Sequence, residues 1–319
     1  AASELNVYSA RHYPSDDALY DGFAQATGIK LNRVEASGDQ LLARLRQEGR
    51  NSPADVLVVV DAGNLWLAER EGLFRSVRSA ALEKAIPARL RHPDGLWFGF
   101  ATRARVIVYN KDTVAWADAP RRYEDLAEAR WKGKVCMRSS SSVYNLSLMA
   151  SLIQHLGEEK AEDWARGLVA NFARDPKGGD TDQIRAVATG ECAVALANTY
   201  YAARLMKSDK DADRAVAAKI GIVFPNQDDR GTHVNVSGAG MLAHAPHPEN
   251  AVRFLEYLLS PEAQALFATA NNEYPVAPGV AADPVLARLG SFKADDLAVH
   301  VLGENQARAP KAYDRAGFK

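Results

Sequence analysis

Apolar residues early in the chain recur in two patterns, which predict strands that alternate with helices. Continuous or alternating apolar runs predict strands at residues 5–9, 29–34 and 54–60. Apolar residues spaced three and four apart predict helices at residues 15–26, 38–48 and 62–71. The first helix is expected to begin at a Ser15 cap and to end at Gly28. This order predicts an α/β half with a largely parallel sheet.

The same alternation resumes after a long strand-like passage at residues 96–110, which has only a short polar interruption. Further strands are predicted at residues 133–137, 193–197 and 219–224. Further helices are predicted at residues 142–155, 158–172 and 182–189. The long passage can carry the chain from one domain into the next. Two α/β halves joined by more than one crossing are typical of hinged binding proteins, so we predict an α/β fold with two lobes and a hinged central cleft.

Composition and charge exclude several classes of function. The chain has 319 residues, of which 47% are hydrophobic and 25% charged, as expected for two globular domains. A net charge of -1 gives no electrostatic basis for binding nucleic acid. No apolar run approaches the roughly 20 residues that a membrane span needs. Because Ala1, Ala2 and Ser3 begin the sequence without methionine, we expect a mature chain from which a signal peptide was cleaved.

The two cysteines, Cys136 and Cys192, each lie near one end of a predicted strand. Two thiols are too few for a cysteine-based zinc site. In an oxidising compartment they can pair, and closing so long a loop is worth about 4 kcal/mol in the chain-entropy model. A disulfide and two buried free thiols are both open interpretations.

Five side chains that can bind a metal lie at the ends of predicted strands or the starts of predicted helices. Tyr200 and Tyr201 follow an apolar strand, and Tyr144 lies just inside a helix that follows a serine-rich segment. His12 and Tyr13 lie on the loop after the first strand. In open α/β sheets, ligands bind at this edge of the sheet. Each residue taken alone is also compatible with a packing role.

The chemistry of phenol and imidazole narrows the choice of metal. Phenolate is a hard anionic donor, and only a strongly polarising cation displaces its proton, whose pKa is about 10. Calcium and magnesium prefer carboxylates, carbonyls and water, whereas zinc and copper favour imidazole or thiolate. Several phenols with one imidazole therefore indicate iron, preferably the ferric ion. The chain has neither a phosphate-binding glycine loop nor a nucleophile elbow, so we do not expect an enzyme.

The chain resembles the periplasmic ferric-iron-binding proteins of bacterial ABC importers. The matching stretches are NVYSARHY (6–13), SSSSVYNLSLMASL (139–152), GECAVALANTYYAARL (190–205), GIVFPNQDDRGTHVNVSGAGM (221–241) and NEYPVAP (272–278). The resemblance implies a type II periplasmic binding fold, with chain crossings near residues 100–102, 224–226 and 274–275. It assigns residues 1–101 and 226–275 to the N-terminal lobe, and residues 102–225 and 276–319 to the C-terminal lobe.

The resemblance also implies the metal ligands and the biological role. Tyr144, Tyr200 and Tyr201 match the ligands of the second lobe, and His12 and Tyr13 match a branch in which a His-Tyr pair completes the site. The protein is then expected to be a periplasmic monomer that transports Fe³⁺ to an ABC permease in the inner membrane.

Arg103 matches a cleft arginine of similar proteins, and its charge would balance four phenolates on one ferric ion. The branch with the His-Tyr pair resembles proteins that need no synergistic anion. A small anion such as carbonate nevertheless stays open, with Arg103, Ser139 and Ser140 as its candidate contacts.

Two other functions stay open. A similar cleft can bind a non-metal ligand, namely a polyamine, thiamine or an inorganic anion. A metalloenzyme with tyrosinate-bound iron is less favoured, because five protein ligands nearly fill the coordination sphere and no spare general base lies beside them.

Overall fold

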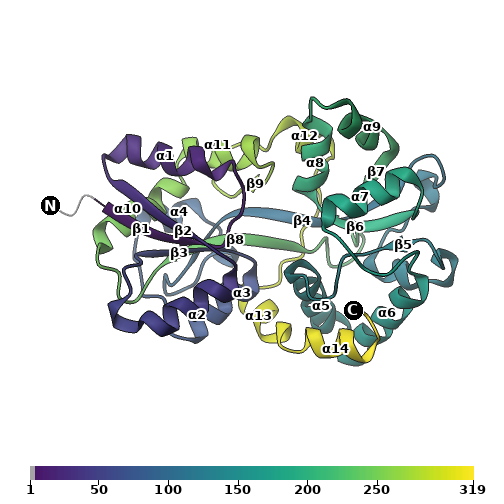
Figure 1. Cartoon of the computed structure of the whole chain (residues 1–319), viewed down its shortest axis with the longest axis horizontal. Helices are drawn as coiled ribbons and strands as arrows, with labels where there is room; N and C mark the ends of the chain where they lie inside the picture. The colour runs from purple at the N-terminus through teal and green to yellow at the C-terminus, as the bar shows by residue number, and fades with distance from the viewer. Residues whose placement is uncertain (1–3) are drawn as a thin grey trace. The chain divides into compact units, whose positions relative to one another are not determined.

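The computed structural model describes residues 4–319, and the chain divides into two units (Figure 1). Unit 1 contains the described residues up to Thr102 together with Val236–Asp283 and Ala298–Gly303. Unit 2 contains Arg103–Asn235, Pro284–Leu297 and Glu304–Lys319. The division into ligand-binding lobes given above stays a prediction. The expectation of a cleaved signal peptide rests on Ala1, Ala2 and Ser3, which lie outside the described residues.

Unit 1 is built on a sheet in which the strand order is β2-β1-β3-β8-β4. Its strands are β1 (Glu4–Ser9), β2 (Lys30–Glu35), β3 (Val56–Val60), β8 (Val234–Met241) and the first part of β4 (Phe98–Asn110). β1 pairs in parallel with β2 and β3, whereas β8 is antiparallel to β3. The predicted parallel α/β half is therefore confirmed for the first three strands.

Helices cover both faces of this sheet, and Figure 1 shows α1 and α2 on opposite sides of it. The helices of unit 1 are α1 (Asp16–Thr27), α2 (Gly38–Glu48), α3 (Ala62–Arg70), α4 (Ala80–Ala85), α10 (Pro248–Leu258), α11 (Pro261–Ala270) and most of α13 (Val299–Gln306). In α2, Leu41, Leu42 and Leu45 are buried, as their spacing on one helical face predicts.

The predicted cap of α1 is wrong at its start and right at its end. The backbone of Ser15 is already helical, with φ of -60° and ψ of -21°, so its side chain does not cap the first turn. Among the described residues, the buried Ser15 hydroxyl has no hydrogen-bond partner. At the other end, Gly28 adopts the left-handed conformation with φ of 71°, which ends the helix as predicted.

The second part of β4 belongs to unit 2, where it pairs antiparallel with β6 (Val194–Asn198) and β7 (Ile220–Val223). β5 (Val135–Cys136) is parallel to β6 and shorter than predicted, because only two of its residues reach the β6 register. The passage predicted at residues 96–110 is thus one strand, which passes from unit 1 to unit 2 after Thr102. β8 passes between the units after Asn235.

Helices in unit 2 follow the predicted alternation closely. They are α5 (Val143–Leu156), α6 (Glu158–Asn171), α7 (Asp180–Thr189), α8 (Thr199–Lys207), α9 (Asp211–Lys219), α12 (Pro284–Arg288) and α14 (Ala309–Arg315). Short 3-10 turns occupy Trp116–Asp118, Tyr123–Ala127 and Ala129–Trp131 in unit 2, and Gly49–Asn51 and Ala88–Leu90 in unit 1. The two-residue strand β9 (Tyr274–Pro275) belongs to unit 1 and pairs with Ala101 and Thr102 of β4.

Alternate residues of the unit 2 strands enter two separate hydrophobic clusters. Ile107 and Leu196 pack with α5, α6 and α14, whereas Val108 and Ala195 pack with α7 and α8. Figure 1 shows α5, α6 and α14 grouped together in this unit. The strands are therefore buried on both faces, which explains their nearly continuous apolar sequences.

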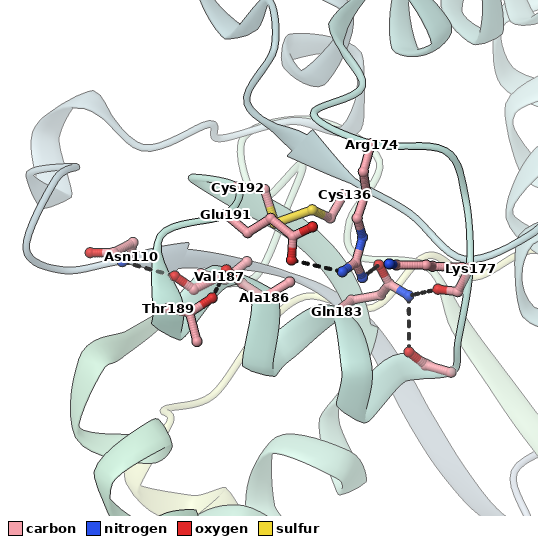
Figure 2. Close-up of a disulfide and its surroundings, with 11 residues drawn as sticks. Asn110, Cys136, Arg174, Lys177, Gln183, Ala186, Val187, Thr189, Glu191 and Cys192 are labelled. Carbon is pink, nitrogen blue, oxygen red and sulfur yellow. Dashed lines mark hydrogen bonds and ion pairs between the residues drawn. A yellow bond between two sulfur atoms is a disulfide. The ribbon is translucent and has the colours of Figure 1, made fainter.

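A disulfide joins Cys136 of β5 to Cys192, which lies two residues before β6 (Figure 2). Their Cα atoms are 5.8 Å apart, and both residues are buried. Figure 2 also shows Arg174 beside the bond, where it donates to Glu191 and Gln183. The alternative of two free thiols is thereby excluded.

Removing this disulfide should destabilise unit 2. The bond spans a sequence separation of 56 residues, and the chain-entropy model then gives a loss of about 4 kcal/mol on cleavage. We expect this decrease in the free energy of unfolding for Cys136→Ala/Cys192→Ala, measured by urea denaturation beside the oxidised wild type. The matched control is wild type unfolded in the presence of reductant, and its free energy of unfolding should decrease by a similar amount. Equal stability of oxidised and reduced protein would contradict the prediction.

Candidate metal centre

Three tyrosine hydroxyls meet in unit 2. The Tyr144 Oη lies 2.8 Å from the Tyr200 Oη and 3.3 Å from the Tyr201 Oη. Tyr144 and Tyr200 are buried, and Tyr201 is half-buried. Three of the five predicted ligands are thus brought together, with their oxygen atoms converging on one point.

The ends of secondary-structure elements place these phenols. β6 ends at Asn198 and α8 begins at Thr199, so Tyr200 and Tyr201 occupy the first turn of α8. The Thr199 hydroxyl accepts a hydrogen bond from the Ala104 backbone N–H at 3.2 Å, which attaches this turn to β4. The rings of these two consecutive residues lie close together, with centres 4.3 Å apart and planes tilted by 32°.

Tyr144 is held by the N-terminus of α5. The Ser142 Oγ accepts a hydrogen bond from the Tyr144 backbone N–H at 3.3 Å and so caps the helix. From α14, the buried Tyr313 donates its hydroxyl to the Asn145 carbonyl at 2.6 Å. The first turn of α5 is therefore fixed both at its cap and from its side.

Three arginines surround the phenols with positive charge. The Arg103 Cζ lies 4.6 Å from the centre of the Tyr200 ring, and its Nη1 donates to the Tyr200 Oη at 3.3 Å. Arg138 and Arg105 lie over the Tyr144 ring at 5.1 Å and 5.7 Å. Positive charge at these distances favours the phenolate over the phenol.

Burial opposes this effect at Tyr144. Loss of solvent raises the pKa of Tyr144 above its ordinary value of 10.0, and the neighbouring Tyr201 raises the pKa further, whereas the charge of Arg103 lowers it. Without a metal, the Tyr144 phenol is therefore protonated at neutral pH. A bound cation has to displace this proton, which only a strongly polarising ion does well.

Asp180 connects the segments that carry the tyrosines, and the sequence analysis missed it. The buried carboxylate accepts from Arg105 Nη1 at 2.8 Å, from Arg138 Nη1 at 3.0 Å and from the Asn198 backbone N–H at 2.7 Å. These partners belong to β4, to the loop before α5 and to the end of β6. The one local signal was Arg105, a charged residue inside an apolar strand.

The other two predicted ligands lie in unit 1, on the loop between β1 and α1. His12 is exposed and Tyr13 is buried, and their ring centres are 4.5 Å apart. The Arg11 Cζ lies 4.8 Å from the centre of the Tyr13 ring. That His12 and Tyr13 act together with the three tyrosines of unit 2 stays a prediction.

The candidate anion contacts all belong to unit 2. Arg103 is buried in β4, whereas Ser139 and Ser140 are half-buried in the loop before α5. The Ser139 Oγ lies 2.9 Å from the Ser141 Oγ and accepts from the Ser141 backbone N–H at 3.2 Å. Anion binding by these residues also stays a prediction.

Residues 4–319 contain neither a histidine, cysteine and carboxylate cluster for a metal nor a membrane-spanning helix. No group of three or more His, Cys, Asp or Glu side chains in this range is arranged to hold a metal. None of the helices in this range is both long and apolar enough to cross a membrane.

In this chain, two strands pass between two α/β units, and side chains that can bind a ligand lie at the ends of strands and helices. These features define the class of two-lobed α/β binding proteins. Residues 51–292 match the model of the bacterial extracellular solute-binding protein family. The chain belongs to this family.

Several relatives and solved structures cover nearly the whole chain. The sequence is 51% identical over 316 residues to iron uptake protein A1 of Synechocystis sp., covering 99% of this chain and 88% of the relative. A Trichodesmium protein solved in complex with iron and citrate ligands is 54% identical, with a TM-score of 0.93 and coverage of 99% and 100% of the two chains. The ferric binding protein from Campylobacter jejuni is 43% identical, with a TM-score of 0.94 and the same coverage. These findings confirm the resemblance to periplasmic ferric-iron-binding proteins and the predicted fold class.

Proposed function

We propose that this protein captures ferric iron in the periplasm and delivers it to an ABC permease. The observation that carries the proposal is the convergence of the Tyr200 and Tyr201 hydroxyls on the Tyr144 hydroxyl, at 2.8 Å and 3.3 Å from it. The names of the relatives, which describe iron uptake and ferric binding, support the same function. In this proposal the three tyrosines of unit 2 and His12 and Tyr13 of unit 1 are the iron ligands.

The donor set explains why the transported ion is ferric. Three phenolates are hard, anionic oxygen donors, and Fe³⁺ has the charge needed to replace their protons. The charges of Arg103, Arg105 and Arg138 lie within 5.7 Å of the phenol rings and lower the cost of gathering phenolates at one point. Reduction of the iron or protonation of a phenolate weakens these bonds and so favours release to the permease.

A small anion is a separate part of the proposal. Arg103 is the proposed contact for carbonate or a similar anion, with Ser139 and Ser140 as hydroxyl donors. The related Trichodesmium protein was solved in complex with iron and citrate ligands, which supports binding of an oxygen-rich anion as well as iron. Repeating an iron titration in bicarbonate-free buffer decides whether carbonate itself is needed.

In this proposal the protein acts as a monomeric binding protein and not as an enzyme. Membership of the extracellular solute-binding family supports a permease as its partner and the periplasm as its location. Five protein ligands would nearly fill the coordination sphere of the iron and leave little room for a reacting substrate.

The test is a visible absorption titration of metal-stripped protein with ferric citrate. We expect a tyrosinate-to-iron charge-transfer band that saturates at one equivalent. Calorimetric titration with spermidine, thiamine and phosphate is the parallel measurement for the competing ligands. Absence of the band combined with heat from one of those ligands would overturn the proposal and identify the class of ligand.

A further inference from the structure

Arg11 is a buried charge next to the proposed ligands of unit 1. Its side chain is fully buried and donates to both oxygens of Asp16, with Nε at 2.6 Å and Nη2 at 2.9 Å. Nη2 also donates to Glu273 Oε1 at 2.8 Å, and Nη1 donates to Ser237 Oγ at 2.8 Å. Burying a guanidinium is costly unless it is paired in this way, so the network keeps the Arg11 side chain in one position.

The partners of Arg11 lie where the chain passes between the two units. Ser237 belongs to β8, two residues after Asn235, the last residue of that stretch of unit 2. Glu273 directly precedes β9, which pairs with Ala101 and Thr102 at the last unit 1 positions of β4. One guanidinium therefore contacts β8 and the residue just before β9 at the same time.

Arg11 also holds the loop that carries His12 and Tyr13. It directly precedes this pair, and its backbone N–H donates to Ser9 Oγ at 3.2 Å. Its guanidinium lies 4.8 Å from the Tyr13 ring centre, within the range of a cation–π contact. Asp16, its bidentate partner, is the first residue of α1. The loop is thus held at both of its ends and beneath the Tyr13 ring.

We propose that Arg11 is a positioning residue that ties the His12–Tyr13 loop to β8 and β9. A change in the course of these strands would then move the two ligands, so iron capture and the geometry of the crossing strands are coupled through one side chain. This inference rests on the proposed function, because it assumes that His12 and Tyr13 bind iron.

Glu273→Gln is the main test. Arg11 faces two carboxylates, so this change leaves one negative charge, that of Asp16, to balance the guanidinium and keeps an oxygen acceptor of the same shape. We expect about a 10-fold loss of iron affinity, the lower end of the effect of partners that contact a metal ligand directly, because Glu273 acts through Arg11. The tyrosinate band from unit 2 should persist. The control is Asp17→Asn. Asp17 lies next to Asp16 in the first turn of α1, and this change removes only its exposed ion pair with Arg33, so the iron affinity should be unchanged.

A double-mutant cycle with His12→Ala separates positioning from general stabilisation. If Glu273 acts through the loop, its substitution should cost much less affinity once His12 is absent, whereas a merely structural role gives additive losses. Ser237→Ala, which removes one hydroxyl contact to Arg11, is the second variant and should show a smaller loss with the same dependence on His12.

The outcomes distinguish this inference from the proposed function. A missing band in wild type, or no effect of His12→Ala, would overturn the assumed iron site. A normal band and a weakened His12→Ala variant, together with unchanged affinity or additive losses in Glu273→Gln and Ser237→Ala, would overturn the role of Arg11 alone.

Discussion

Replacement of Tyr200 by Phe is expected to lower the affinity for ferric iron by more than about 100-fold, because removing even a partner outside the ligand sphere costs 10–100-fold. Tyr200 is fully buried, and its hydroxyl contacts both Tyr144 Oη and Arg103 Nη1. The substitution deletes one proposed donor oxygen and keeps the ring, so packing against its neighbours is preserved. Competition with citrate, followed by the visible band, measures the loss.

The matched control is Tyr109→Phe. Tyr109 lies in β4 of the same unit and is similarly buried, but it belongs to the hydrophobic cluster formed with α5 and α6. This variant should bind iron like wild type, and both variants should retain the far-UV circular dichroism of the fold. An unaltered affinity and band in Tyr200→Phe would mean that the three phenols only pack together.

Replacement of Asp180 by Ala is expected to lower the free energy of unfolding by about 3–5 kcal/mol, because it leaves a buried charge without its partner. Arg105 has a side chain that is only 2% exposed and would lose its carboxylate, and Arg138 would lose its ion pair as well. The Asn198 backbone N–H would also lose its acceptor. Urea denaturation gives the difference directly.

Two further variants make this result specific. Asp180→Asn keeps an oxygen acceptor and should be less destabilising than Asp180→Ala. Asp228→Ala removes an exposed ion pair with Arg122 in the same unit and should leave the stability almost unchanged, because such pairs contribute little. Equal effects of Asp180→Ala and Asp228→Ala would show that the buried network does not stabilise unit 2.

The fold was predictable where a short segment of sequence determines its own structure. The helix predicted at residues 38–48 is α2, since its leucines repeat on one face and Ser37 forms a capping box with Gln40. The cap at Ser15 failed because its backbone is already helical, and the next residue, Asp16, pairs with Arg11, whose other partner Glu273 lies 262 positions away. No local pattern contains that information.

The candidate site shows the same limit. The three tyrosines could be found from their positions at the ends of predicted elements and from the resemblance to a family. Asp180 could not, because its pairing with Arg105 spans 75 positions and joins two elements that the sequence does not place side by side. The disulfide likewise stayed open, since strand predictions around Cys136 and Cys192 did not give the parallel pairing of β5 with β6.

The interleaved order of the two units has a consequence for biosynthesis. β1, β2 and β3 are made first, but β3 keeps an unpaired edge until β8 is available. Unit 2 similarly needs α14, whose Tyr313 supports the turn of α5 that carries Tyr144. An open strand edge invites pairing with other chains. The β3 edge is therefore open to such pairing while the polypeptide grows, and the folded sheet of unit 1 can be completed only after most of the chain has been synthesised.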